Sequence, residues 1–207
     1  MILLFLLWGT VRADAEPPDY AESLAIAAEN EADQLLADGR LEEALTLVQA
    51  FQASVLEDPR IAYEEALILR HLDRNEEATV LLLEITAKHP DMAAPWYDLG
   101  EIHLSKGQMA QARTAFQEAT NLTEEHPLGW AGPYRLAEVA AFQEDAQGFE
   151  ASLREALRRG FSFSRTVGGD PRWSRFLAHP ELGPILRQLA TVYGEEAVLE
   201  TWSSPDR

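Results

Sequence analysis

Apolar residues recur along this chain at spacings of three and four, with charged and polar residues between them, from Tyr20 almost to the end. Such spacing places the apolar side chains on one face of an α-helix. Alanine, leucine and glutamate, which favour helices, dominate these stretches, and no long alternation of β-branched and polar residues appears. The pattern therefore predicts an all-α protein.

Short breaks interrupt the helical pattern at regular intervals, and each contains a residue that ends helices or forms turns. The breaks are Asp38-Gly39, Asp58-Pro59, Asp73 to Asn75, His89-Pro90, Lys106-Gly107 and His126-Pro127. The intervals between them suit helices of ordinary length, so we expect short helices joined by tight turns.

The second helix of each expected pair begins with a repeated alanine. Ala44, Ala78 and Ala112 are 34 residues apart (78 − 44 and 112 − 78), and each follows a turn. Early glutamates in the first two of these helices suit the positive end of a helix dipole. A fixed period of this length indicates a repeat architecture.

A tyrosine ladder follows the same period and then departs from it. Tyr63 and Tyr97 are 34 apart (97 − 63), whereas Tyr97 and Tyr134 are 37 apart (134 − 97). Three extra residues therefore enter between Ala119 and His126, and we expect them in a longer helix end around 121–125.

The clearest copy of the unit lies between Trp96 and Ala119, where small residues stand at helix contacts and large residues between neighbouring units. Its signature residues are Trp96, Leu99, Gly100, His103, Ala112, Phe116 and Ala119. This unit resembles the tetratricopeptide repeat, and the resemblance covers roughly residues 21–160. It implies a right-handed α-solenoid of about four helix–turn–helix repeats, at about 25–58, 59–92, 93–126 and 130–160.

The resemblance also implies a binding surface, because the first helix of each repeat lines a concave groove in this family. The positions carried over are Arg60, Tyr63, Arg70, His71, Tyr97, Glu101, Tyr134 and Glu138. Tyrosines at one repeat position either contact a partner or pack between helices, and both interpretations stay open. The lysines and asparagines with which some members bind acidic chaperone C-termini are absent, so that ligand is not expected.

The pattern changes after Gly160. The stretch that begins at Asp170-Pro171 and contains Trp173 resembles the segment that closes the array in many bacterial repeat proteins. A terminal repeat exposes an apolar face that needs a cover, so we expect residues 161–194 to form a helical cap. Residues 195–207 are expected to be a frayed tail.

The N-terminus has the layout of a secretory signal peptide. An apolar run over 2–8 is followed by small residues, including Ala13 and Ala15. We expect a signal peptide over 1–15, a linker over 16–20 and export to the periplasm or the cell exterior. The run is too short for a membrane span, which needs about 20 apolar residues. The alternative is an apolar element packed on the domain.

Composition excludes several functions. The net charge of −18, from 17 basic and 35 acidic residues, disfavours nucleic acid and anionic lipid as partners. The absence of cysteine excludes disulfides, zinc–thiolate sites and cysteine nucleophiles. The segment Arg154 to Arg175 is locally basic, and its arginines either pair with acidic neighbours, which we favour, or bind an anionic ligand.

No catalytic or metal-binding pattern stands out. Three of the five histidines precede proline, and His71 and His103 lack a partner at metal-binding helical spacing. Adjacent glutamates point about 100° apart on a helix and do not converge. We therefore expect no metal, no cofactor and no enzymatic activity.

The resemblance and the expected export together imply a protein- or peptide-binding scaffold or assembly factor of the cell envelope. The alternatives are an accessory domain that binds an anionic ligand through Arg154 to Arg175, and a helical hydrolase with an unrecognised site.

Overall fold

The computed structural model describes residues 20–54, 58–166, 171–195 and 197–198, and all regular structure in these ranges is helical. The all-α prediction is therefore confirmed. The expected signal peptide and almost all of the expected linker and tail lie outside the described residues. Two compact units, Met1–Ile102 and His103–Arg207, meet within one helix, α5 (Ala93–Ser105), and each is described by itself.

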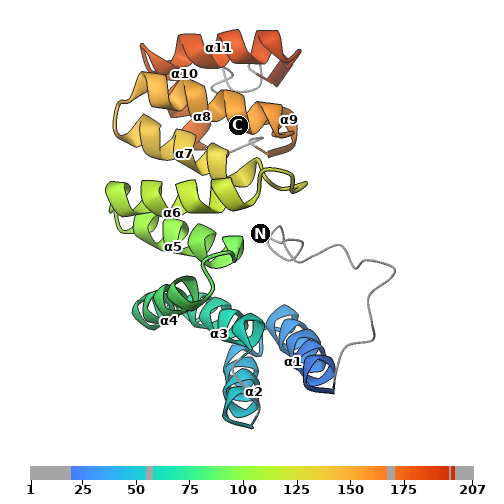
Figure 1. Ribbon diagram of the computed structural model, residues 1–207. Coiled ribbons are helices and arrows are strands. Elements are labelled where there is room, and N and C mark those ends of the chain that lie inside the picture. Colours follow the sequence, from blue (N-terminus) through green and yellow to red (C-terminus); the bar gives the residue numbers. More distant parts are fainter. Residues whose placement is uncertain (1–19, 55–57, 167–170, 196, 199–207) are drawn as a thin grey trace. The chain divides into compact units, whose positions relative to one another are not determined.

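Unit 1 consists of helices that pack in antiparallel pairs. It contains α1 (Tyr20–Ala37), α2 (Leu41–Ser54), α3 (Pro59–His71), α4 (Asn75–Lys88) and the first part of α5 (Figure 1). The helix α1 packs on α2, and α3 packs on α4. The pairs are joined by contacts of α3 with both α1 and α2. We call α1, α3, α5 and α7 the first helices, because each precedes the turn of its expected repeat.

Alanines stand where the two helices of a pair touch. Ala32 and Ala44 in the first pair, and Ala66 and Ala78 in the second, have no exposed surface. A residue this small lets two helix backbones approach closely, and larger neighbours fill the space between pairs. Ala44 and Ala78, which the 34-residue period picks out, are therefore buried positions of the structure.

Each pair turns through one residue in the left-handed backbone region. These residues are Gly39 (φ 73), Asp73 (φ 59), Gly107 (φ 70) and Glu144 (φ 58). The first three are 34 apart and the fourth is 37 further on (144 − 107), so one turn geometry recurs. Glycine adopts this conformation without cost, whereas Glu144 holds it against steric repulsion.

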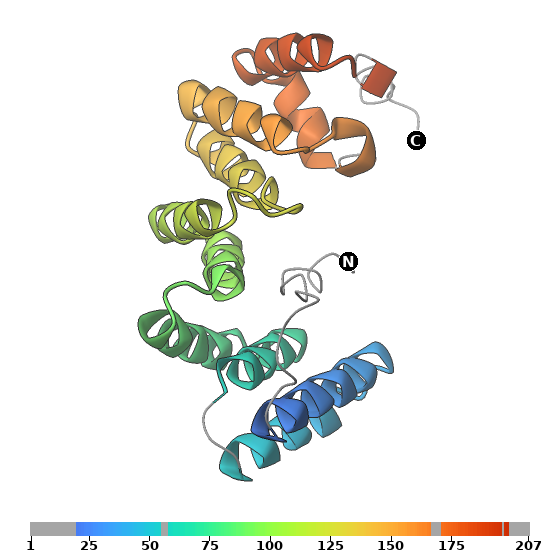
Figure 2. The same ribbon diagram turned by 45° about the vertical axis from the view of Figure 1, so that its right-hand side comes forward.

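Unit 2 stacks three longer helices and closes with a set of shorter ones. It contains α6 (Met109–Leu122), α7 (Ala131–Phe142), α8 (Ala146–Arg158), α9 (Phe163–Thr166), α10 (Pro171–Ala178) and α11 (Leu182–Val192). The helix α7 packs on both α6 and α8, and α11 contacts both α8 and α10 (Figure 2).

The three extra residues lie in a loop and do not lengthen a helix. The helix α6 ends at Leu122, which is 34 residues after the end of α4 at Lys88 (122 − 88). The expected longer helix end around 121–125 is therefore wrong, and the insertion lies in the connection 123–130. Arg159 holds this connection, because its guanidinium donates to the carbonyls of Thr120 at 3.0 Å and Gly129 at 3.4 Å.

Aromatic residues after α8 build the core of unit 2. The Trp173 side chain is fully buried, and its ring stacks on Tyr134 of α7 with the centroids 5.6 Å apart. Its indole nitrogen donates a 3.2 Å hydrogen bond to the Tyr134 hydroxyl. Phe161 and Phe163 pack edge-on in the same cluster. These contacts cover the apolar surface of α7 and α8, as a terminal cap must.

Within the described ranges, no helix combines the length and the apolar content that crossing a bilayer requires.

Candidate functional site

A buried carboxylate connects two first helices of unit 1. Asp98 of α5 has no exposed surface, and it accepts a 2.6 Å hydrogen bond from the Tyr63 hydroxyl of α3. Its other oxygen accepts from the Arg70 guanidinium, also on α3. Burial raises the pKa of Asp98, and the charge of Arg70 opposes that shift. The network ties neighbouring repeats together through polar groups.

Directly after Tyr63, a second carboxylate is buried, and no cation is among the causes of its pKa shift. Glu64 of α3 is 5% exposed, and its Oε2 atom finds no hydrogen-bond partner among the described residues. Burial raises the pKa of Glu64 to about 8, and the nearby charges of Asp33, Glu29 and Asp98 contribute to that shift. A carboxyl group that is mostly protonated at neutral pH therefore lies beneath the first-helix surface.

Glu29 and Asp33 of α1 complete a set of three acids, and we call Glu29, Asp33 and Glu64 the first-helix carboxylate cluster. Burial is the main cause of the raised pKa of both α1 residues. The Asp33 Oδ1 atom is buried and has no partner in the described part of the chain. Arg60 lies near Glu29, but its guanidinium donates to Asp58 at 3.1 and 2.7 Å. The charge of Arg60 partly opposes the shift in the pKa of Glu29, whereas no cation is among the causes of the shifts in the pKa of Asp33 and Glu64.

The sequence carried a signal for this cluster that the predicted groove positions did not include. Glu29 lies 34 residues before Tyr63 (63 − 29), and it therefore holds the same repeat position as the tyrosine ladder. Glu64 and Asp98 are likewise 34 apart (98 − 64). The predicted groove positions belong to the second, third and fourth repeats only, so the acids of the first repeat were left out.

The predicted groove residues divide between the units. In unit 1, His71 is exposed and Tyr97 and Glu101 are partly exposed, whereas Tyr63 is buried. In unit 2, the hydroxyl of the buried Tyr134 accepts from Trp173, and the fully buried Glu138 accepts from the Arg135 guanidinium. Tyr63 and Tyr134 are both buried and hydrogen-bonded within the protein, which is the geometry expected of tyrosines that pack between helices. The structure brings Tyr63 and Arg70 together at Asp98, and Arg60 is held by Asp58.

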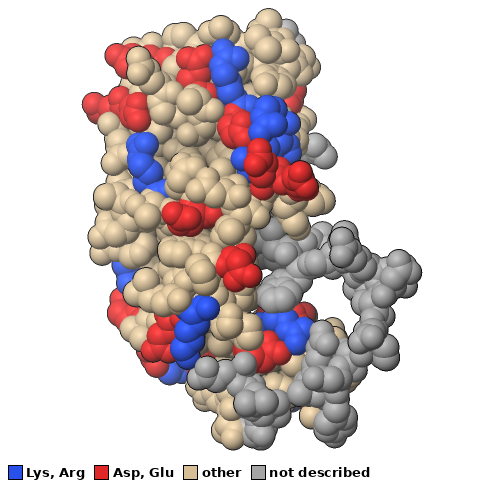
Figure 3. Space-filling model, viewed as in Figure 1, with Lys and Arg blue, Asp and Glu red and all other residues tan. Residues whose placement is uncertain are grey.

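The arginines at the end of α8 pair with acids of the same helix. Arg154 binds Glu150 at 2.7 Å, and Arg158 and Arg159 both bind Glu155 at 2.6 Å. These arginines hold the pKa of Glu155 down at about 2, chiefly through the hydrogen bond from Arg158. Around α8, blue and red side chains lie next to each other in Figure 3. For these three arginines, pairing with acidic neighbours describes the structure.

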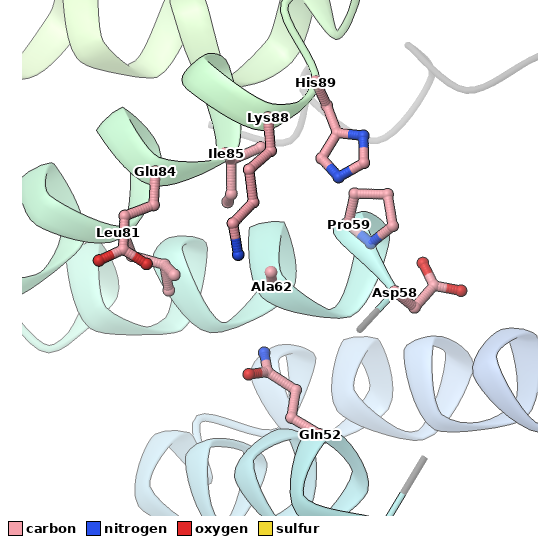
Figure 4. Close-up of a pocket in the computed structure, with 9 residues that line it drawn as sticks. All are labelled: Gln52, Asp58, Pro59, Ala62, Leu81, Glu84, Ile85, Lys88 and His89. Atoms are coloured by element: carbon pink, nitrogen blue, oxygen red, sulfur yellow. The ribbon is translucent and has the colours of Figure 1, made fainter. Parts of the chain in front are cut away.

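A cavity of about 220 Å³ opens between α2, α3 and α4. Its lining residues are Gln52, Asp58, Pro59, Ala62, Leu81, Glu84, Ile85, Lys88 and His89 (Figure 4). The Lys88 side chain extends from α4 toward Ala62, and acidic side chains lie at the rim. None of the predicted groove residues lines this cavity. Its lining mixes apolar groups with groups of both charges, so it does not indicate which class of ligand would bind there.

In the described part of the chain, no group of three or more histidine, aspartate and glutamate side chains is arranged to hold a metal ion.

Antiparallel helix pairs with a common turn, buried alanines at their contacts and polar residues on their first helices define a helical-repeat protein. The sequence comparison identifies the family: the tetratricopeptide repeat profile matches residues 29–84 and 80–127. The chain belongs to the tetratricopeptide repeat family, as its 34-residue period predicted. None of the curated proteins matches it in sequence.

Solved structures of tetratricopeptide proteins share the fold. One is MamA 41-end from Desulfovibrio magneticus RS-1, at 19% identity and a TM-score of 0.59, over 92% of this chain and 99% of that one. Another contains the TPR-like repeats of a Podosopora anserina putative kinesin light chain, at 19% identity and 0.59, over 89% and 95%. A third is a thermophilic TPR protein in Thermus thermophilus, at 21% identity and 0.55, over 84% and 86%.

At these identities the likeness shows the fold alone, and it confirms the α-solenoid class. Tetratricopeptide proteins bind protein partners and are generally non-enzymatic, so the fold suggests a protein-interaction scaffold.

Proposed function

We propose that this protein is a scaffold that binds a protein or peptide segment on the first helices of unit 1. The observation that carries the proposal is the carboxylate cluster, whose buried oxygens on Glu64 and Asp33 lack partners in the described chain. Burying a polar group without a hydrogen bond costs free energy. A ligand that donates hydrogen bonds to these oxygens would offset that cost. In this family the first helices are the ligand-binding elements.

The contact surface is proposed to include three predicted groove residues of unit 1 that have exposed surface and lie outside the Asp98 network, His71, Tyr97 and Glu101. The buried Tyr63 and Asp98 then hold α3 and α5 in register beneath that surface. This division of roles gives the polar network a positioning function and leaves binding to the side chains above it.

Photo-crosslinking in the native host tests the site. A photoreactive amino acid in place of the partly exposed Tyr97, on the first helix α5 and outside the carboxylate cluster, is expected to capture a defined protein. The matched control is Val80, which is 60% exposed on the second helix α4. Equal capture of the same proteins from both positions would place binding elsewhere on the molecule or show that it is non-specific.

We further propose that the scaffold acts in the cell envelope, with residues 1–15 as its signal peptide. The apolar run over 2–8 and the small residues after it support this proposal. Mass spectrometry of the protein isolated from its host should find a mature chain that begins after Ala13 or Ala15. A cytoplasmic protein that keeps Met1 would refute the export proposal and leave the scaffold proposal intact.

A further inference from the structure

We propose that the first-helix carboxylate cluster, formed by Glu29, Asp33 and Glu64, binds the side chain of a lysine or arginine from an extended segment of the partner protein. This inference rests on the proposed function and names the chemistry that the partner presents at this site.

The first step of the argument is burial. Glu64 is 95% buried (5% exposed), and its Oε2 atom has no hydrogen-bond partner in the described chain. Asp33 contributes a second buried oxygen without a partner, from the neighbouring helix α1. Two orphan acceptors on facing helices can both be satisfied by one group that carries several N–H donors. Guanidinium and ammonium groups are such donors, and an acid or a hydroxyl would satisfy fewer acceptors.

The second step is charge. The two nearby cations of α3 are engaged by other acids, since Arg70 binds Asp98 and Arg60 binds Asp58. Arg60 lowers the pKa of Glu29 only in part, and no cation contributes to the pKa of Asp33 or Glu64, so the up to three negative charges of the cluster are poorly compensated. A cation from outside relieves both the mutual repulsion and the cost of desolvation.

The third step is the kind of cation. No described set of side chains has the arrangement of a metal site, so a bare divalent ion is not the occupant that the geometry favours. Glu29 and Asp33 are partly exposed, which leaves the cluster open to solvent on the α1 side. A long flexible side chain can enter from there while its backbone stays on the first-helix surface.

The probe is a nonapeptide of glycine, serine and alanine with blocked ends and one central arginine. Its twin carries citrulline, which has nearly the same shape and no charge. Binding to the full chain is measured by NMR titration of ¹⁵N-labelled protein. We expect shifts at amides of α1 and α3 with the arginine peptide, and at least about tenfold weaker binding of the citrulline peptide.

Variants assign the binding to these residues. Glu64→Gln and Asp33→Asn keep the side-chain shape and should each weaken the arginine peptide about tenfold or more. The control is Glu42→Gln, which removes an exposed charge from the second helix α2 and should leave the affinity unchanged. Circular dichroism and thermal unfolding establish that each variant is folded.

The pH dependence of peptide binding is a second measurement, which a purely structural role of Glu64 would not affect. Burial raises the pKa of Glu64 to about 8, and the charges of Asp33 and Glu29 on α1 and of Asp98 on α5 add to that shift. A bound cation favours the ionised form, so the arginine peptide should bind about tenfold more tightly at pH 7 than at pH 6. In Glu64→Gln this dependence should disappear.

Equal binding of the two peptides, no binding of the arginine peptide at millimolar concentration, or unchanged affinity in both cluster variants would overturn the inference. In any of these cases, specific crosslinks from Tyr97 would still support the scaffold. Loss of the crosslinks alone would instead refute the scaffold site, so the two proposals fail separately.

Discussion

The Tyr63 hydroxyl on α3 lies 2.6 Å from a carboxylate oxygen of Asp98 on α5, and both side chains are buried. The two residues belong to consecutive repeats, so this hydrogen bond crosses a repeat boundary. Because Arg70 donates to the second oxygen, Asp98 serves as the shared acceptor of the network.

Removing the shared acceptor should cost more than removing one donor. Asp98→Ala leaves the Tyr63 hydroxyl and the partly buried Arg70 guanidinium without their acceptor, and we expect a loss of roughly 3 kcal/mol in the free energy of unfolding. Tyr63→Phe removes one hydrogen bond and should cost about 1 kcal/mol. Urea unfolding followed by circular dichroism measures both. Equal costs for the two substitutions would show that Asp98 does not organise the network.

Glu64 should make unit 1 less stable as the pH rises. Its pKa is about 8 in the folded protein and 4.5 is its ordinary value, so between these limits the folded state binds more protons than the unfolded state. Its contribution to stability is therefore full below about pH 4.5 and is lost as the pH rises toward 8.

The variant Glu64→Gln should remove this dependence. We expect it to unfold at a higher urea concentration than the wild type at pH 8, with a difference that shrinks by up to about 1.4 kcal/mol per pH unit toward pH 5. The exposed Glu42→Gln serves as the control. A constant difference between variant and wild type across this range would contradict a buried, protonated Glu64.

The repeat could be predicted from the sequence because each copy needs small residues at the same buried positions. Ala44, Ala78 and Ala112 are all fully buried at helix contacts, as their 34-residue spacing required. The position of the three extra residues was not predictable in the same way. Residues 121–125 suit either a helix or a loop, and the contacts of Arg159, far along the chain, hold the loop in place.

The candidate site was only partly predictable for a related reason. The repeat register assigns positions to first helices, and extending it back by one period would have added Glu29. The repeat register does not reveal that the Glu64 side chain is buried while the adjacent Glu65 stays partly exposed. Burial at that position depends on how α1 packs against α3, which is a tertiary property.

Trp173 should be the residue on which unit 2 depends most. It is fully buried, stacks on Tyr134 and donates to the Tyr134 hydroxyl. We expect Trp173→Ala to cost about 3–5 kcal/mol of unfolding free energy, measured by urea unfolding. Trp173→Phe keeps a ring and should cost less. The exposed Arg175→Ala, on the same helix, should show no change beyond error. A mild effect of Trp173→Ala would mean that the cap is not part of the core of unit 2.

Glu144 offers a stabilising substitution. It is the only turn residue in unit 2 among the described positive-φ residues that is not glycine. Glu144→Gly relieves the steric cost of the left-handed conformation and should raise the unfolding free energy by about 1 kcal/mol. The reverse change at the equivalent position, Gly107→Ala, should lower it by a similar amount. A loss of stability in Glu144→Gly would show that the side chain makes a contact worth more than the strain.

Arg158 and Arg159 are adjacent, share the acceptor Glu155 and should nevertheless behave differently. The Arg159 side chain is 9% exposed and also donates to the carbonyls of Thr120 and Gly129 at the two ends of the inserted connection, whereas Arg158 is 61% exposed. Arg159→Ala leaves two carbonyls without this donor, so we expect a loss of about 1–3 kcal/mol and faster amide hydrogen exchange over 123–130. Arg158→Ala removes only a surface ion pair and should leave both the stability and the exchange rates unchanged within error. If the two variants give the same exchange pattern, the connection is held by its own turns and the long-range contacts of Arg159 are incidental.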